Sequence, residues 1–203
     1  MTAKQALERG LRELALALPE GADEKLLAYV ALIEKWNRTY NLSAIRDRLA
    51  MVSRHVLDSL VVVPHLPLPE HGASLADVGS GAGLPGIPIA IARPGWAVTL
   101  NDASEKKSAF LRQAAIELGL ANVQVHEGRV EAWRPAQRFS LVISRAFAAL
   151  SEFIAAARHL VAPGGVLAAM IGREAGMRAD CEVIALNVPL LRAERHLVLC
   201  RLG

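Results

Sequence analysis

The sequence predicts an α/β protein with a doubly wound, mostly parallel seven-stranded sheet, an N-terminal helical extension and an antiparallel C-terminal hairpin. Two observations favour this fold. A glycine-rich turn follows a short apolar run at residues 74–78, which is typical of a strand that leads through a ligand-binding loop into a helix. From residue 74 onward, apolar segments of strand length alternate with helical segments, which is the pattern of parallel β-α-β units.

The first part of the sequence predicts three helices. Leucines at three- and four-residue intervals predict a helix over residues 4–18 that ends at Pro19. A second helix begins near Asp23, with apolar residues that include a tryptophan on its buried face. A third begins at Asp47, a good N-cap residue, and ends before Pro64.

These helices form an extension over residues 1–66, and a proline-rich linker joins it to a sheet domain over residues 73–203. Five apolar segments of the sheet domain are predicted strands: 74–78, 97–101, 122–127, 138–144 and 165–171. Helices are predicted between them, near 86–93, 105–118 and 150–161. The remaining tail fits two strands joined by a tight turn, and so an antiparallel edge pair.

The composition is that of a globular protein. Of the 203 residues, 53% are hydrophobic and 21% charged, and no apolar run reaches the ~20 residues that a membrane span needs. No secretory signal or metal-binding spacing is visible, so we expect a cytoplasmic protein without metal or membrane partner, and a monomer by default. Cys181 and Cys200 are expected to be reduced thiols. The net charge of +3 permits a nucleic-acid partner without requiring one.

The glycine-rich turn runs from Asp77 to Gly86 as Asp-Val-Gly-Ser-Gly-Ala-Gly-Leu-Pro-Gly. Glycines allow the backbone angles of a tight turn and let peptide N–H groups approach a ligand. The turn formally fits the dinucleotide pattern G-x-G-x-x-G, but an acid before three alternating glycines fits better the first motif of class I (Rossmann-like) S-adenosylmethionine-dependent methyltransferases. The predicted cofactor-binding residues of this motif are Asp77, Gly79, Gly81 and Gly83. An NAD site and a tight turn without ligand are the alternatives.

The residues that follow each strand are the other candidates, because ligands of open α/β sheets bind at the carboxyl ends of strands. Asp102 follows the second strand, at the spacing where an acid accepts hydrogen bonds from ribose hydroxyls. The segment 127–131 follows the third strand and suits an adenine ring. Within it, Arg129 faces RNA or is a solvated surface charge.

The fourth strand ends in Ser144-Arg145-Ala-Phe147. Methyltransferases that act on exocyclic amines usually have Asn/Asp-Pro-Pro-aromatic at this point, and pyrimidine C5 methylation needs a cysteine nucleophile there. The sequence has neither. A ring nitrogen such as guanine N7 needs no proton removed, so positioning could supply most of the catalysis. Arg145 is then predicted to position the guanine or a neighbouring phosphate.

Residues 35–55 carry a local excess of positive charge. One acid, Asp47, stands against five cations, and two aromatic residues, Trp36 and Tyr40, lie among them. The five cations are Lys35, Arg38, Arg46, Arg48 and Arg54. This composition favours an RNA-facing surface, and the alternative is that the aromatic residues are core and the arginines merely solvated. A nearby His55, Asp58 and Ser59 lack the loops of a catalytic triad, which we therefore reject.

Along almost its whole length the chain resembles the glucose-inhibited division protein B family, bacterial methyltransferases that modify guanine N7 in 16S ribosomal RNA. The strings that carry the resemblance begin at Lys35 (KWNRTYNLS), Arg54 (RHVLDSL), Asp77 (DVGSGAGLPGIP), Val142 (VISRAFA) and Glu194 (ERHL). The resemblance implies an S-adenosylmethionine pocket with Asp102 near the ribose, lined by Gly79, Leu84, Val130, Glu131 and Arg145. It also implies RNA-facing roles for Arg54, His55, Arg195 and His196.

The chain departs from this family at the end of the fifth strand. Relatives commonly have a lysine before the glycine there, whereas this chain has Ile171 before Gly172, so a cationic contact is missing or is supplied by Arg173. The sequence and the resemblance together predict methyl transfer from S-adenosylmethionine to N7 of a guanine in 16S rRNA of the small ribosomal subunit. An NAD(P)-dependent oxidoreductase and a non-catalytic RNA-binding protein remain alternatives.

Overall fold

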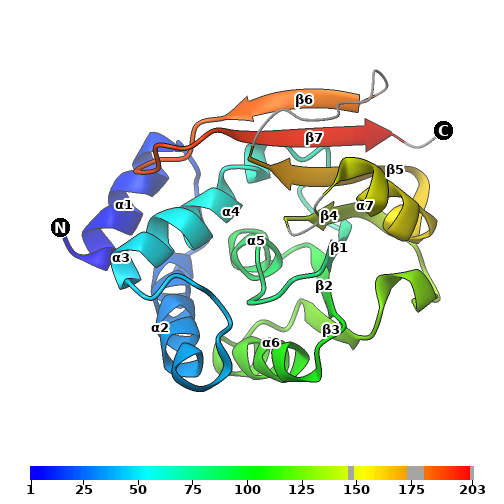
Figure 1. The fold of residues 1–203 in the computed structure, drawn as a ribbon. Helices are drawn as coiled ribbons and strands as arrows, with labels where there is room; N and C mark the ends of the chain where they lie inside the picture. Colours follow the sequence, from blue (N-terminus) through cyan, green and yellow to red (C-terminus); the bar gives the residue numbers. More distant parts are fainter. Residues whose placement is uncertain (146–148, 173–180, 202–203) are drawn as a thin grey trace.

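A computed structural model of the chain describes residues 1–145, 149–172 and 181–201 (Figure 1). Within this part of the chain the strands form one seven-stranded sheet in the order β3-β2-β1-β4-β5-β7-β6. The strands are β1 Ser74–Val78, β2 Ala97–Asp102, β3 Val123–Glu127, β4 Phe139–Ser144, β5 Val161–Ile171, β6 Cys181–Leu186 and β7 Arg195–Arg201. The pairs among β1 to β5 are parallel, whereas β7 runs antiparallel to both β5 and β6. The predicted fold class is confirmed.

The strand order reverses direction at β1. The chain builds outward from β1 through β2 to β3, and then returns to add β4 on the other side of β1. In open α/β sheets a crevice forms beyond the carboxyl ends of the two strands at such a switch point. The residues that follow β1 and β4, the glycine-rich turn and Arg145, are therefore brought to one place.

Helices cover both faces of the sheet (Figure 1). One face carries α1 Ala3–Glu13, α2 Ala22–Tyr40, α3 Arg48–Met51, α4 Asp58–Leu60, α5 Gly86–Ala92 and α6 Glu105–Glu117, and the other carries α7 Leu150–Ala157. Successive strand residues alternate between the two cores, as their opposite orientations require: Leu75 belongs to the first and Ala76 to the second. The N-terminal helices share one continuous core with the sheet, because Leu26 and Met51 lie in the same cluster as Leu75.

The first helix is shorter than the predicted 4–18, because α1 ends at Glu13. Its carbonyls are capped by N–H groups of Ala15 and Leu16, which donate to Arg12 and Leu11 at 3.1 and 3.3 Å. This pair of hydrogen bonds is typical of a helix C-terminus that is followed by a residue in the left-handed region. Ala15 is that residue here, with φ 49°. This helix end was not predicted because glycine is the usual residue at this position.

The predicted third helix contains a π-helical turn. Its start is confirmed, because the Asp47 side chain accepts a hydrogen bond from the Ala50 N–H at 2.7 Å. A π-helical segment, Val52–Leu57, then widens the backbone between α3 and α4. Such turns occur mostly at functional sites, and this one carries Arg54 and His55. Hydrophobic periodicity cannot reveal it, since the apolar residues still face the core.

The two cysteines correct a prediction. Cys181 and Cys200 are direct cross-strand partners in β6 and β7, with Cα atoms 4.4 Å apart, and they form a disulfide. They are therefore not reduced thiols. The sequence does not reveal the disulfide, because a separation of 19 residues does not show the strand register that places the two side chains opposite each other. The strands are joined by residues 187–194, a longer connection than the predicted tight turn.

Candidate active site

The glycine-rich turn forms one wall of a cavity of about 280 Å³. Gly81 lies there with φ +60°, and a Cβ added to it would meet nothing nearer than the Gly79 carbonyl oxygen at 3.9 Å, so it would project into open space. The turn is held from the N-terminal extension, because the buried Tyr29 hydroxyl on α2 donates to the Ala82 carbonyl at 2.5 Å. The cavity lining consists of Leu42, Ser43, His55, Gly79, Ser80, Gly81, Ala82, Leu84, Lys107 and Arg145.

Asp77 lies beneath this turn rather than in the cavity. Its side chain is fully buried, and one carboxylate oxygen accepts the Gly86 N–H at 2.9 Å, while the other has no partner among the described residues. Burial raises the pKa of Asp77 to about 7. The carboxyl group therefore ties the end of β1 to the start of α5. In this position it shapes the turn that a ligand would contact.

Asp102 faces the same turn from the end of β2. Its two carboxylate oxygens accept the N–H groups of Gly81 and Ser104, each at 2.9 Å, and Lys107 Nζ lies 3.8 Å away. The acid predicted for the ribose thus lies directly against the glycine-rich turn. Lys107, which also lines the cavity, was not considered from the sequence.

The residues after β3 are placed differently from the prediction. Val130 begins a 3-10 turn, is buried in the second core, and does not line the cavity. Glu131 and Arg129 are exposed and line neither this cavity nor the one described next. The segment is tied to the end of β2, because the Gly128 N–H donates to the Asp102 carbonyl at 3.0 Å. Contact of Val130 and Glu131 with a cofactor remains a prediction.

A second cavity of about 370 Å³ lies beside the first, and His55 and Arg145 line both. Its lining is Ile45, Arg54, His55, Asp58, Arg145, Met170, Ile171, Gly172 and Arg195. A Cβ built on Gly172 would lie 3.8 Å from Arg195 Nη1, so Arg195 supplies a cation at the end of β5. Arg173, the other candidate for that contact, lies outside the described residues.

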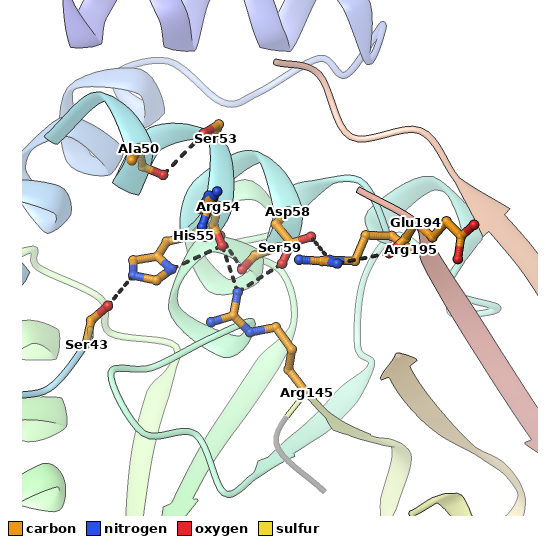
Figure 2. A network of polar contacts seen from close by, with 10 residues as sticks. All are labelled: Ser43, Ala50, Ser53, Arg54, His55, Asp58, Ser59, Arg145, Glu194 and Arg195. Atoms are coloured by element: carbon orange, nitrogen blue, oxygen red, sulfur yellow. Dashed lines mark hydrogen bonds and ion pairs between the residues drawn. The ribbon is translucent and has the colours of Figure 1, made fainter. Parts of the chain in front are cut away.

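Asp58 joins two of the predicted arginines (Figure 2). One of its oxygens lies 3.1 Å from Arg145 Nη1 and the other 2.8 Å from Arg195 Nε. Arg145 Nη1 also donates to the Arg54 carbonyl at 3.0 Å. Sequence reasoning named Arg145 and Arg195 for separate roles and considered Asp58 only within the rejected triad. The sole sequence signal for it was its place in the string shared with the resembling family.

His55 is buried, with 5% of its surface exposed. Its Nδ1 lies 3.1 Å from the Arg54 carbonyl and its Nε2 2.7 Å from Ser43 Oγ. A carbonyl can only accept, so Nδ1 carries the proton and Nε2 accepts from the serine. Burial, with a further contribution from Arg145, lowers the pKa of His55 to about 4, so the ring is neutral at pH 7. A neutral, buried imidazole carries no charge for RNA phosphates, and the RNA-facing role of His55 remains a prediction.

The side chains of His196 and Arg195 lie on opposite faces of the sheet. They are neighbours on β7, and successive strand side chains point to opposite faces. Arg195 points to the face that carries α4, where it meets Asp58, so His196 points to the other face and lines neither cavity. Its Nδ1 is buried and has no partner within the described part of the chain.

The segment 41–47 contributes both to the two cavities and to the basic surface. Leu42, Ser43 and Ile45 line the cavities, whereas Arg46 is exposed. Asn37, buried at the end of α2, fixes this segment through hydrogen bonds with the Ser43 N–H at 2.8 Å and with the Ser43 and Ile45 carbonyls at 3.0 and 3.1 Å. This role was not predicted from the sequence, because the asparagine lies within a charged helical stretch.

The structure agrees in part with the predicted basic surface. All five cations of residues 35–55 are exposed. The rings of Trp36 and Tyr40 are tilted by 33° with centroids 5.1 Å apart. Trp36 is half-buried against Phe110, whereas Tyr40 is 44% exposed. Trp36 is therefore only partly core. Within the described ranges no cluster of residues could hold a metal ion, and no described helix combines the length and apolar character needed to cross a membrane.

Comparison with known proteins agrees with this arrangement. A solved structure of a SAM-dependent methyltransferase from Aquifex aeolicus matches 74% of this chain and 92% of its own, with a TM-score of 0.56 and 16% identity. TrmN from Thermus thermophilus matches 82% of this chain and 53% of its own, with a TM-score of 0.53 and 20% identity. The sheet order, the glycine-rich turn and these matches define the fold of a class I methyltransferase.

The sequence comparisons are more specific. The family model described as rRNA small subunit methyltransferase G matches residues 22–194. Proteins named ribosomal RNA small subunit methyltransferase G from Burkholderia thailandensis and Burkholderia pseudomallei are 50% and 51% identical, over 97% of this chain and 90% of theirs. The chain belongs to the rRNA small subunit methyltransferase G family, which confirms the family resemblance seen in the sequence.

Proposed function

We propose that this protein transfers the methyl group of S-adenosylmethionine to N7 of a guanine in 16S rRNA of the small ribosomal subunit. The observation that carries the proposal is the pair of adjoining cavities. One is walled by the glycine-rich turn and the other by three arginines, and His55 and Arg145 line both. Two ligands bound there would meet beside Arg145.

The residues of the smaller cavity fit S-adenosylmethionine. The open space above Gly81 is the kind of cradle that a side chain would fill, and the Asp102 carboxylate lies against the same turn. Lys107 and Ser43 add polar groups to the wall. The cosubstrate supplies an electrophilic methyl group on a sulfonium sulfur. Gly79, Gly81 and Leu84 would hold it, with Asp102 near the ribose.

The chemistry of the lining favours an acceptor that needs no base. Among the described residues, the carboxylate and imidazole that line the two cavities are both engaged: Asp58 by two arginines, and His55 by Ser43 and the Arg54 carbonyl. Guanine N7 exposes a lone pair, which forms the new N–C bond while the S–C bonding electrons stay on sulfur. No proton moves, and the positive charge passes to the base.

The competing acceptors lack support. Cys181 and Cys200 are the only two cysteines of the chain and are joined to each other, so neither offers the thiolate that C5 methylation requires. The strand end after β4 holds Ser144 and Arg145 in place of an Asn-Pro-Pro sequence. The Ser144 hydroxyl donates to the Val78 carbonyl at 2.7 Å, so it serves to join β4 to β1.

The rRNA of the small subunit is proposed as substrate because the relatives named above carry that substrate in their names. The exposed cations on α2 and the segment 41–47 would meet its phosphates. A ribosomal substrate places the protein in the cytoplasm. The disulfide does not itself support that location, because disulfides are rare in reducing compartments.

Two measurements test the proposal against its alternatives. Titration with S-adenosylhomocysteine and, in parallel, NADH should give saturable binding of the first alone; the reverse would favour an oxidoreductase. Labelled methyl from S-adenosylmethionine should then pass to small subunits that lack the modification, and not to large subunits or tRNA. Binding of rRNA without binding of S-adenosylhomocysteine would point instead to a non-catalytic RNA-binding protein.

A further inference from the structure

Asp58 is the only acidic side chain that lines the larger cavity in the described part of the chain. Its side chain is 3% exposed, while the side chains of Arg145 and Arg195 are 25% and 27% exposed. A buried carboxylate thus holds two guanidinium groups whose remaining surface faces solvent or the cavity. The three charges sum to +1, and Arg54 adds a fourth charge at the same cavity.

The sheet fixes the backbone of these two arginines but not the positions of their guanidinium groups. Arg145 follows β4, Arg195 begins β7, and β5 lies between the two strands. A free arginine side chain can adopt many rotamers. The two oxygens of Asp58 remove that freedom from both at once, at 3.1 and 2.8 Å. Asp58 is itself fixed by its place after the π-helical turn.

The two arginines share the larger cavity, and one of them also reaches the smaller one. Arg145 lines both cavities, whereas Arg195 lines only the larger one. The shared carboxylate therefore lies at the junction where a methyl donor and an acceptor base would meet. It also places a negative charge beside that junction, where the base would gain positive charge on methylation.

We propose that Asp58 is a positioning residue for methyl transfer, which holds Arg145 and Arg195 at the junction of the two cavities and offsets their charge there. This inference rests on the proposed function. It predicts that loss of the carboxylate reduces the rate of the chemical step more than it weakens the binding of either ligand.

The test compares Asp58→Asn, Arg145→Met and the double variant with wild-type protein. An amide can accept from only one arginine and presents its N–H groups to the other, so one guanidinium is released. Asp58→Asn is expected to lower kcat about 10- to 100-fold, since a misplacement near 1 Å can have an effect of that size. KM for small subunits and the affinity for S-adenosylhomocysteine should change less than about 3-fold, a shift too small to account for the loss.

The double variant separates positioning from a general structural role. If Asp58 acts through Arg145, Asp58→Asn should reduce kcat little further in the Arg145→Met background. Full multiplication of the two losses, or a loss that appears entirely in KM, would overturn the proposal. Glu8→Gln, at an exposed ion pair on α1, is the matched control for carboxylate removal and should retain wild-type kinetics.

Folding and function are checked separately. Circular dichroism and thermal unfolding report whether Asp58→Asn still folds; if it does not, Arg195→Met removes one guanidinium and leaves the Asp58–Arg145 pair, and it should retain more activity than Arg145→Met. Equal or greater loss in Arg195→Met would contradict the proposal. Absence of transfer by wild-type protein to any RNA would instead contradict the proposed function, and S-adenosylhomocysteine binding would still be measurable.

Discussion

Arg145 and Asp58 are 87 residues apart in the sequence and lie 3.1 Å apart in the structure, Nη1 to Oδ2. This pair joins the end of β4 to the first residue of α4, directly after the π-helical turn of the N-terminal helices. It explains why the extension is part of the site rather than an attachment. Both cavities have walls from each side of this contact.

Gly81→Val should abolish binding of S-adenosylhomocysteine, because the new side chain would enter the smaller cavity. The left-handed backbone at Gly81 (φ +60°) also adds a strain of about 1–2 kcal/mol. Gly119→Val is the matched control, since Gly119 has φ +61° and open space around it but lies at the end of α6, outside the cavity. Both variants should lose similar stability, and calorimetric titration should detect lost binding in Gly81→Val alone. Unchanged affinity would remove the turn from the cofactor site.

Asp77 should make the protein less stable as pH rises from about 4 to 7. Its folded pKa of about 7 exceeds the usual 3.8, so the folded state binds more protons than the unfolded state throughout that interval. The slope is roughly 1 kcal/mol per pH unit. Asp77→Asn should remove this contribution, which urea unfolding of both proteins at pH 5, 6 and 7 would measure. A constant stability difference across these pH values would contradict the assignment.

His55 should have the opposite effect on the pH dependence of stability. Its folded pKa of about 4 lies below the usual 6.5, so the unfolded state binds more protons between these values and stability falls as pH falls from 6.5 to about 4. His55→Gln should flatten that decline, whereas His65→Gln, at an exposed position, should not. If His55→Gln and wild type lost stability in parallel below pH 6.5, His55 would not be held neutral.

The basic surface should act on RNA binding and not on chemistry. Lys35→Glu with Arg38→Glu should raise KM for small subunits about 10-fold or more at low salt, and should reduce the dependence of KM on salt, because fewer phosphates are neutralised. The control is Lys4→Glu with Arg12→Glu on α1, which changes charge by the same amount at exposed positions. Equal effects of the two double variants would show that net charge matters and that this surface does not.

The sequence predicted the architecture because its signals are local. Strand length, helical periodicity and glycine punctuation placed β1 to β4, α5 and α6 within about two residues of their observed bounds. Two bounds were wrong by four residues, since α7 ends at Ala157 rather than 161 and β5 begins at Val161 rather than 165. Other errors occurred where a local rule was broken. Ala15 occupies a position that normally requires glycine, and the π-helical turn keeps the same apolar residues inward.

The site was predicted less completely because its contacts are long-range. Gly79, Gly81, Leu84 and Arg145 do line the smaller cavity. The contributions of Tyr29, Asn37 and Asp58 could not be predicted, since each acts through a partner that only the fold brings near. The disulfide has the same origin, as it follows from the register of β6 against β7.

The most direct test of the central claim is the chemical identity of the product. Small subunits lacking the modification would be incubated with the protein and S-adenosylmethionine labelled in its methyl group, and the purified 16S rRNA treated with borohydride and aniline, which cleave RNA at N7-methylguanine. We expect label in 16S rRNA and cleavage at a single guanine. Label in 16S rRNA that resists this cleavage would contradict N7 as the acceptor.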